Sequence, residues 1–570
     1  MTNDSSNSSD RSAGPAGGQS DEAASTGLPR RDFFKVAGAG AGALLISGAG
    51  NAAAVTNVPS PKATRSVRSA SASPDVVVVG AGLWGSFTAY HLRKSGVNVT
   101  LVDAYGPGNA RATSGDETRG VRSSYGDKRG TLGELWMLWA RESMRRWTQF
   151  DDEWGREMRL NLFHVTGDII YRAEWDNFQL QCKLWWDKNK IPYQVLNPDD
   201  VRKAFPVVGM EDITACLYEP DAGVVRARRA AQAAAAAFEH LGGTIKIGRA
   251  SPSKMTNGRL EEISLDTGGS LRADKFVYCV GPWLGKTFPD IFAKKTRTPM
   301  GYVVYFATPI GDHRFTYPNM PSFNFPGVTG WPALPVDNRG FRVRGAERAP
   351  TPANQVADAN GRGGAPGADA NAAQQGRGNA RANNSPTTDT GSNMANAGNP
   401  AGAPADARAA RGGRGGRGAD GGGGGGNPGG GGFGQQQDVP PAQQDPDTSD
   451  RWASLDRIDG SRRFVAHRFP ILKDAPVAQT HSCHYESTSS SNFIVDWHPA
   501  WANVLIGAGG NAEGAKFAPK MGDYIAQRAM GIVGDKAIAD VFKIPEKDFD
   551  PPAPPPADSA AARGRGGRPP

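Results

Sequence analysis

Three glycines and one acidic residue within residues 75–103 have the types and the spacing that bind a dinucleotide. Gly80, Gly82 and Gly85 follow an unbroken run of valines and precede apolar residues at helical spacing. In such a turn one glycine permits the tight bend, one lets the backbone approach a pyrophosphate, and one allows close helix-to-strand packing. Asp103 lies where a carboxylate would accept hydrogen bonds from ribose hydroxyls. The alternative, an ordinary glycine-rich turn, leaves Asp103 unexplained.

The elements that must position these residues alternate between strands and helices. Apolar spacing predicts helices over 133–154 and 228–241 and from about Met521, and strands over 76–79, 97–102, 163–171, 243–247, 274–280, 302–307, 341–343, 493–496 and 504–506. This order indicates an α/β fold of mixed α+β character, with a Rossmann-like nucleotide-binding unit and an added sheet. Residues 109–127, dense in Gly, Ser, Asp and Arg, are predicted to be a functional loop.

Composition shows that the folded part is smaller than the chain of 570 residues. The segments 350–444 and 551–570 are rich in Gly, Pro, Ala and Arg and have too little apolar area to offset chain entropy, so both are predicted to be disordered. Much of the arginine behind the net charge of +8 lies in such segments, so this charge does not indicate an anionic partner. The arginine–glycine stretch 411–418 is a candidate for nucleic-acid binding, but Phe433 is its only aromatic companion, and we expect no stable nucleic-acid partner.

The first 54 residues have the features of an export signal. Arg30 and Arg31 precede two phenylalanines, a lysine and a mildly apolar run too short to span a bilayer, and small residues follow. The paired arginines resemble the twin-arginine signal, so we expect export to the periplasm or the medium and no transmembrane anchor. A chance pair of arginines is the alternative. Residues 55–74 are predicted to be a linker.

Five motifs together carry a family resemblance. They are GDETRGVRSSYG from Gly115, EPDAGVV from Glu219, VGPW from Val280, the segment from Cys483 to Asp496, and EGAKF from Glu513. With the glycine turn, they make the chain resemble FAD-dependent oxidoreductases of the D-amino-acid-oxidase-like group, above all monomeric sarcosine oxidases and N-methyltryptophan oxidases. The resemblance implies FAD, oxidation of an amine or N-alkyl amino acid, and a protein that is a monomer.

The resemblance also implies two interleaved domains. The FAD-binding domain would comprise residues 75–160, 220–290 and 490–545, and the substrate domain, built on a mixed or antiparallel sheet, residues 161–219, 291–349 and 445–489. The segment 350–444 would then be an insertion, because the shorter chains of the family close up at Asp445 to Thr448.

Four residues match catalytic positions of the family. Arg122 and Lys516 match an arginine and a lysine that hold the substrate carboxylate, and a bidentate guanidinium with a second cation would aim the amine carbon at the flavin. Arg119 matches an arginine beside the flavin ring, where a cation helps stabilise the reduced ring. Arg342 falls at the position of a lysine that promotes reaction with oxygen. Because arginine differs from lysine in bulk and in proton donation, oxygen and a quinone-type carrier both stay open as electron acceptors.

Cys483 matches the family's site of covalent flavin attachment. A disulfide with Cys182, Cys216 or Cys279, or an unmodified thiol, is the alternative. The spacing of His481, Cys483 and His484 does not fit a metal site, so none is expected. The resemblance adds further cofactor-binding residues, which are Thr118, Gly281, Trp283, Gly509 and Gly514.

Several positions depart from the family pattern. Its active-site tyrosine falls at Val328 or Thr329, one histidine falls at Ala346, and a second falls at Glu513. Much of the substrate pocket therefore differs, which makes sarcosine itself a doubtful substrate. A flavin-binding surface protein whose working part is the insertion, and a nicotinamide dehydrogenase, are the rival interpretations.

Overall fold

The computed structural model describes residues 75–128, 130–335, 339–345 and 445–550, all within a single compact unit. The predicted export signal (1–54), linker (55–74), insertion (350–444) and tail (551–570) lie outside the described residues, as does Ala346. Within the described part, no helix is both long enough and apolar enough to cross a membrane.

A six-stranded sheet carries the glycine turn. Its order is β21 (Ile494–Trp497), β22 (Val504–Ala508), β13 (Lys275–Tyr278), β1 (Val76–Val79), β2 (Val99–Asp103) and β9 (Thr244–Ile247), and all neighbours are parallel except β21 and β22. Val76 and Val78 pack into one hydrophobic core, while Val77 and Val79 pack into another. Because both faces of β1 are covered, the strand is an unbroken run of valines rather than an alternating pattern.

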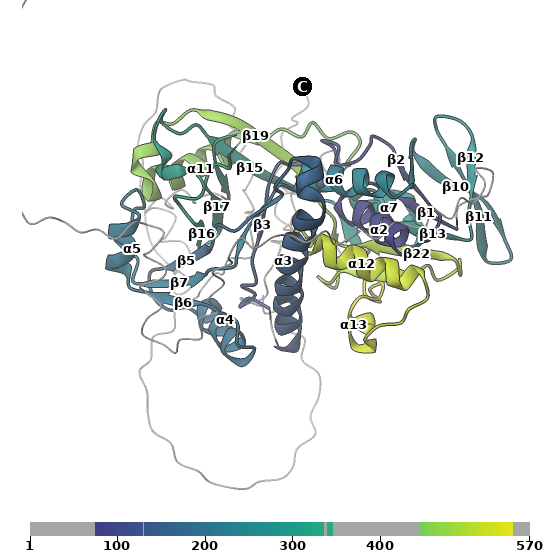
Figure 1. Ribbon diagram of the computed structural model, residues 1–570, viewed down its shortest axis with the longest axis horizontal. Helices are drawn as coiled ribbons and strands as arrows, with labels where there is room; N and C mark the ends of the chain where they lie inside the picture. The colour runs from purple at the N-terminus through teal and green to yellow at the C-terminus, as the bar shows by residue number, and fades with distance from the viewer. Residues whose placement is uncertain (1–74, 129, 336–338, 346–444, 551–570) are drawn as a thin grey trace, which may run out of the picture. The chain divides into compact units, whose positions relative to one another are not determined.

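Helix α2 (Leu83–Lys94) directly follows the glycine turn. It packs against α6 (Ala227–His240) and α12 (Ala518–Ala529), and α3 (Gly130–Met158) packs against α12 (Figure 1). Helix α12 begins at Ala518 rather than near Met521, because Pro519 is accommodated in its first turn, where no backbone N–H is needed. The remaining described helices are α4 (Asn177–Lys188), α5 (Pro198–Ala204), α7 (Leu284–Thr287), α8 (Pro289–Phe292), α11 (Leu455–Arg468) and α13 (Lys536–Val541).

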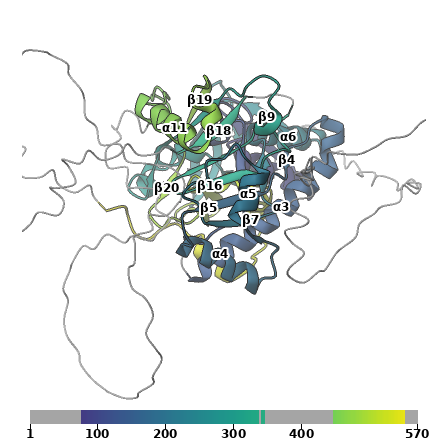
Figure 2. The same ribbon diagram turned by 90° about the vertical axis from the view of Figure 1, so that its left-hand side faces the viewer.

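The added sheet has eight strands. Its order is β19 (Val477–His484), β15 (Met300–Phe306), β18 (Phe341–Arg344), β17 (Val328–Trp331), β16 (Ser322–Phe325), β5 (Asp168–Arg172), β7 (Ala215–Glu219) and β6 (Gln194–Leu196). Only β16 and β5 run parallel, so the sheet is mixed. Figure 2 shows β5 and β7 beside α5. The predicted α/β class with mixed sheets is confirmed, whereas the division into two domains stays a prediction.

Two predictions about elements are wrong. The predicted strand 163–171 is two strands, β4 (Phe163–His164) and β5, because Gly167 between them has a positive φ of 69° that ends an extended run. The predicted loop 109–127 contains strand β3 (Arg119–Val121), which pairs with β8 (Gly223–Val225), as does β4. Two small sheets complete the described part, one of β10 (Ala250–Thr256), β11 (Arg259–Leu265) and β12 (Ser270–Arg272), and one of β14 (Thr296–Arg297) and β20 (Ser487–Thr488).

Candidate active site

The turn between β1 and α2 has room only for glycine at two positions. Gly80 has a φ of 100°, and a Cβ there would overlap the carbonyl of Cys279. A Cβ on Gly85 would overlap the carbonyl of Gly80, so this glycine lets α2 lie directly against the turn. The close packing expected from the sequence is therefore present.

A cavity, here called the cofactor cavity, opens at this turn. Gly80, Gly82 and the first residues of α2 form one end, so the positive helix N-terminus faces the space where a pyrophosphate would bind. Gly281, Trp283 and Gly514 also line it, with Thr113, Ser114, Arg119, Cys279, Tyr485, Glu486, Gly507, Gly510, Ala512 and Ala515 among the other lining residues. A cradle of small residues around a helix N-terminus fits a dinucleotide such as FAD.

Asp103 fixes the shape of the turn. Its Oδ2 accepts a hydrogen bond from the backbone N of Ala81 at 2.7 Å, and its Oδ1 accepts from the backbone N atoms of Tyr105 (2.8 Å) and Gly106 (2.9 Å). Burial raises the pKa of this carboxyl, and these backbone bonds oppose that rise. Oδ1 is fully used by these donors, but Oδ2 accepts only one bond and keeps a second lone pair, so ribose binding stays a prediction for Asp103.

A second cavity, here called the substrate cavity, shares three lining residues with the cofactor cavity. These are Arg119, Ala512 and Ala515. Its other walls come from β3 and the residues after it, from β17 and β18, and from the segment before α12; they include Gly120, Arg122, Ser124, Tyr125, Asp127, Phe178, Thr329, Trp331, Arg342, Arg344, Glu513 and Lys516. The two cavities are therefore adjacent, with Arg119 in the wall of both.

Arg122 and Lys516 both line the substrate cavity. Arg122 makes no hydrogen bond or ion pair to another residue of the described part, so its guanidinium is available to a ligand. The Nζ of Lys516 donates to the Tyr125 hydroxyl at 2.9 Å. Burial lowers the pKa of Lys516 to about 8, and the Glu513 carboxylate opposes this effect while the Arg122 guanidinium adds to it. Two cations that repel each other beside a cavity form a suitable site for a carboxylate.

The Lys516 end of the cavity also holds acids. Glu513 lies 3.6 Å from the Nζ of Lys128 and 3.9 Å from that of Lys516. Burial and the Glu513 carboxylate together raise the pKa of Asp127 to about 6. Glu513 therefore compensates the charge of the two lysines.

Arg119 lies on β3 where the two cavities adjoin. Its Nη1 donates to Asp116, its Nη2 donates to the backbone O of Thr113 at 2.7 Å, and the same Nη2 lies 3.4 Å from the Sγ of Cys483. Burial would raise the pKa of Asp116, but Arg119 and Arg342 outweigh this and hold that pKa well below its usual range. Arg119 is therefore a fixed cation beside Cys483 in the wall of both cavities.

Arg342 is almost fully buried in the wall of the substrate cavity. It lies opposite Trp331 and Tyr305 in the sheet register, its guanidinium stacks 3.9 Å from the centre of the Trp331 ring, and its Nη2 donates to Asp116 at 3.1 Å. Since side chains alternate along a strand, the neighbouring Thr329 faces the same cavity and Val328 does not. Of the two residues predicted at the family's active-site tyrosine, only Thr329 lines the cavity, and the correspondence itself stays a prediction.

All four cysteines are free thiols in the structure, and Cys182, Cys216 and Cys279 are buried. Cys483 lies on β19 opposite Gly301 of β15 and is the most accessible of the four. Within the described ranges, His, Cys, Asp and Glu side chains form no group of three or more that could hold a metal ion.

Five predicted cofactor residues do not line either cavity, namely Gly85, Asp103, Thr118, Cys483 and Gly509. The Thr118 hydroxyl accepts from Trp331 Nε1 at 3.0 Å and lies 3.3 Å from the Tyr305 hydroxyl, so it supports the wall of the substrate cavity. Gly509 has a φ of 75° and lies just before the lining residue Gly510. The sequence interpretation missed Asp116 and Arg344. The available signal for Asp116 was an acidic pair, Asp116 and Glu117, just before Arg119 and Arg122, whereas Arg344 gave none before its register was known.

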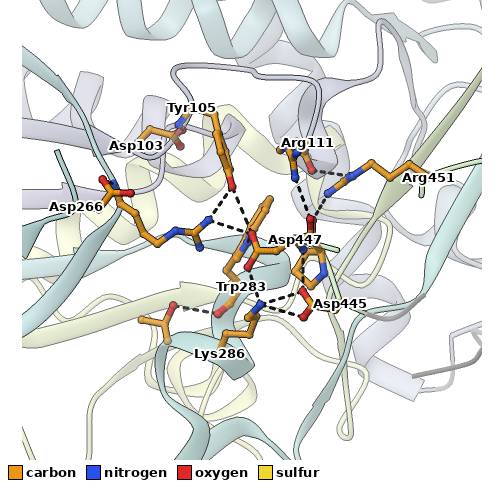
Figure 3. Close-up of polar contacts among 12 residues, drawn as sticks. Asp103, Tyr105, Arg111, Asp266, Trp283, Lys286, Asp445, Asp447 and Arg451 are labelled. Carbon is orange, nitrogen blue, oxygen red and sulfur yellow. Dashed lines mark hydrogen bonds and ion pairs between the residues drawn. The ribbon is translucent and has the colours of Figure 1, made fainter. Parts of the chain in front are cut away.

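An acidic segment directly after residue 444 lies beside the cofactor cavity. Asp447 accepts from Trp283 Nε1 at 2.8 Å, from Lys286 Nζ at 2.6 Å and from Arg249 Nη2 at 3.0 Å, and Asp445 accepts from Lys286 at 2.9 Å. Figure 3 shows these contacts converging on Asp447. Because Trp283 also lines the cavity, this segment fixes part of the cavity wall.

The sequence model of the FAD dependent oxidoreductase family, DAO, matches residues 75–381, which include the glycine turn, β3 and β18. The chain belongs to this family. The predicted family resemblance and the expectation of FAD as the cofactor are therefore confirmed, and the two adjacent cavities are those of an FAD-dependent oxidoreductase.

The relatives of this chain among known proteins include three oxidases. The oxidoreductase is 24% identical to the monomeric sarcosine oxidase of Bacillus sp. (strain B-0618) over 41% of this chain and 57% of that protein. It is 22% identical to the human peroxisomal sarcosine oxidase over 80% of this chain and 92% of that protein. It is 23% identical to the N-methyl-L-tryptophan oxidase of Yersinia pestis (strain Pestoides F) over 38% of this chain and 56% of that protein. For the first and third of these relatives, the alignment thus spans little more than half of the relative's length.

A solved structure has the same fold. The glycine oxidase of Bacillus cereus ATCC 14579 superposes with a TM-score of 0.56 at 15% identity, covering 84% of this chain and all of that chain. At this identity the likeness concerns the fold alone.

Proposed function

We propose that this oxidoreductase oxidises the carbon–nitrogen bond of an amine or an N-alkyl amino acid. One observation carries the proposal: Arg122 and Lys516 line a cavity that adjoins the cofactor cavity at Arg119. A carboxylate bound between the two cations would hold the neighbouring carbon close to the cofactor cavity, on the side of Arg119, which the family resemblance places beside the flavin ring. The names of the relatives, which are oxidases of sarcosine or of N-methyl-L-tryptophan, support the same class of substrate.

FAD, when bound, would accept the two electrons of the oxidation. The carbon that bears nitrogen loses a hydride, the nitrogen loses a proton, and water hydrolyses the resulting imine to a carbonyl compound and an amine. Arg122 and Lys516 would contribute by binding the carboxylate and fixing its orientation, so that the C–H bond to be broken faces the cofactor cavity. Arg119 contributes a fixed positive charge at the point where the negative charge arrives.

The test is a turnover screen of the purified holoprotein with N-methyl and D-amino acids, run once with oxygen and once with an artificial dye as acceptor. We expect turnover of at least one N-alkyl amino acid. Peroxide formation would identify an oxidase, and dye reduction without peroxide would identify a dehydrogenase that uses a quinone-type carrier. Bound flavin without turnover of any amine would contradict the proposal and favour a non-catalytic flavin-binding protein, and a protein without bound flavin would favour a nicotinamide enzyme.

Covalent attachment of the flavin through Cys483 is part of the proposal. Its support is that the Sγ of Cys483 lies 3.4 Å from the Nη2 of Arg119, and that Arg119 lines both cavities. After acid denaturation, flavin absorbance should stay with the polypeptide, and Cys483→Ser should release it to the supernatant. Cys216→Ser is the matched control, because Cys216 is a buried cysteine of the eight-stranded sheet.

Export through the twin-arginine pathway is likewise proposed, on the basis of Arg30 and Arg31 in the sequence. Replacing both by lysine should keep the full-length protein in the cytoplasm with its flavin bound. Cell fractionation with flavin fluorescence measures this outcome, and unchanged export of the double variant would contradict it.

A further inference from the structure

The substrate cavity holds more positive charge than one carboxylate can balance. Four arginines and one lysine line it, namely Arg119, Arg122, Arg342, Arg344 and Lys516, whereas its acidic lining residues are Asp127 and Glu513. Both acids lie at the Lys516 end, where Glu513 also pairs with Lys128. The excess of positive charge is therefore on the side formed by β3 and β18.

On that side Asp116 is the one acid that binds arginines of the cavity, among the residues described. It accepts from Arg119 and, at 3.1 Å, from Arg342, so two guanidinium groups share one carboxylate. His481 adds no charge at neutral pH, because burial lowers its pKa to about 4. The net charge of Asp116, Arg119, Arg342 and His481 is thus positive at neutral pH, and Arg344 adds a further positive charge.

Arg342 keeps two donors without a partner. It is 1% exposed, and neither its Nε nor its Nη1 has a hydrogen-bond partner among the described residues. A buried donor without an acceptor is costly, and a buried charge more so, unless a ligand completes the bonds.

Arg344 lies on the same face of the sheet. It is two residues after Arg342 on β18 and opposite Thr329 on β17, so both arginines and Thr329 face the cavity. Its guanidinium makes no hydrogen bond or ion pair with the described part of the chain. Burial lowers the pKa of Arg344, and Arg342 and Arg119 lower it further. Two positions on the same face of β18 thus place two incompletely paired guanidinium groups beside one cavity.

We propose that Arg342 and Arg344 form a second anion subsite in the substrate cavity, so that the ligand is doubly anionic. One carboxylate binds to Arg122 and Lys516, and a second acidic group, on the side chain or on the nitrogen substituent of the amino acid, binds to Arg342 and Arg344. The substrate class is then an N-substituted amino acid with two acid groups. This inference rests on the proposed function, which supplies the first carboxylate.

The experiment measures ligand binding to the holoprotein by titration calorimetry at constant ionic strength. Malonate, succinate and glutarate are compared with acetate, propionate and butyrate. We expect at least one dicarboxylate to bind about tenfold or more tightly than the monocarboxylate that lacks its second carboxyl group, since charged hydrogen bonds of this kind have at least that effect.

Variants assign this preference to residues. Arg344→Gln should abolish the dicarboxylate preference and leave monocarboxylate affinity unchanged, whereas Arg344→Lys should keep part of the preference. Arg272→Gln, at an exposed arginine of β12 that pairs with Glu262, is the matched control and should bind like the unmodified protein. A preference that survives in Arg344→Gln, or that is absent from the unmodified protein, would overturn the inference.

A titration with inorganic phosphate tests whether the second anion is part of the substrate or a separate ion. The binding data also show whether this inference or the proposed function fails. If inorganic phosphate raises monocarboxylate affinity and Arg344→Gln removes that effect, the subsite exists and binds a separate ion. If the holoprotein binds monocarboxylates without preferring dicarboxylates, this inference fails and the proposed function stands. If it binds no carboxylate, both fail.

Discussion

Arg122 is the residue whose change should affect substrate binding most directly. Its guanidinium makes no hydrogen bond or ion pair in the described part of the chain, and the buried Asp168, whose pKa is raised by burial and lowered by this guanidinium, keeps Arg172 and Lys516 as further cations nearby. Arg122→Met should weaken carboxylate binding by about 2–4 kcal/mol, which corresponds to a rise of about 30-fold to 1000-fold in Kd or KM. The thermal unfolding temperature should stay unchanged, and a fall in that temperature with unchanged KM would contradict the assignment.

Lys516 should make carboxylate binding depend on pH. Its pKa of about 8 means that the side chain is charged below that pH and neutral above it. Affinity should therefore be present at pH 7 and fall as the pH rises through 8, with a slope of up to about tenfold per unit. Protonation of Asp127, whose pKa is about 6, should strengthen binding further at lower pH.

The profile of Kd against pH for a monocarboxylate measures this. In Lys516→Met the step near pH 8 should vanish while the step near pH 6 remains, because only the first belongs to the lysine. A step near pH 8 that persists in the variant would assign it to another group.

At the scale of elements, the contact between α2 and the glycine turn should be sensitive to a single methyl group. A Cβ on Gly85 would overlap the carbonyl of Gly80, and backbone atoms cannot move aside as a flexible side chain can. Gly85→Ala should therefore destabilise the fold by about 1–3 kcal/mol and lower the flavin content. Gly534→Ala is the control, because its nearest atom, in Tyr524, would be 3.9 Å away. Equal flavin content in the two variants would contradict the packing argument.

The segment at Asp445 and Asp447 should stabilise the fold in a pH-dependent manner. Burial raises the pKa of Asp447, but bonds from Lys286, Trp283 and Arg249 outweigh this and lower it. A lowered pKa means that the stabilisation is complete above the unfolded value near 4 and is lost as the pH falls toward the folded value. Asp447→Asn should reduce the free energy of unfolding at pH 7 by about 1–3 kcal/mol, and by less below pH 4, as denaturant unfolding would measure.

Elements were predictable from the sequence where local pattern determines them. The turn with Gly80 and Gly85 and helix α6 follow from short-range spacing, and both lie within a residue of their predicted positions. Strand β3 was missed because its Arg-Gly-Val sequence has no strand pattern and is extended only by pairing with β8, which is distant in the chain.

The candidate site was predictable where the family motifs reach and not beyond them. Arg119, Arg122 and Lys516 line the cavities as the resemblance implied. Arg344 could not be identified, because an arginine on a strand gains meaning only when the register with Thr329 shows which face it occupies. The role of Asp116 also depends on tertiary structure, because its carboxylate accepts hydrogen bonds from Arg119 of β3 and from Arg342 of β18.

At the scale of the molecule, the described fold holds both ends of the segment 346–444 by its own contacts. The Ser461 hydroxyl of α11 donates to the carbonyl of Gly345 at 2.9 Å, and Lys286 holds Asp445 at 2.9 Å. Replacing residues 351–444 by a short Gly/Ser linker should therefore leave flavin content, unfolding temperature and turnover unchanged. Loss of flavin would show that the segment contributes to the cofactor site, whereas loss of turnover alone would implicate it in catalysis.

Arg119 lines both cavities, so anion binding in the substrate cavity and reduction of the flavin in the cofactor cavity depend energetically on each other. An anion in the substrate cavity and electrons arriving in the cofactor cavity both draw on the same positive field, so each disfavours the other. Thermodynamic linkage requires the two effects to be equal: the factor by which reduction weakens anion affinity is the factor by which the anion opposes reduction. The midpoint potential of the flavin in this protein should therefore fall when an anion occupies the substrate cavity.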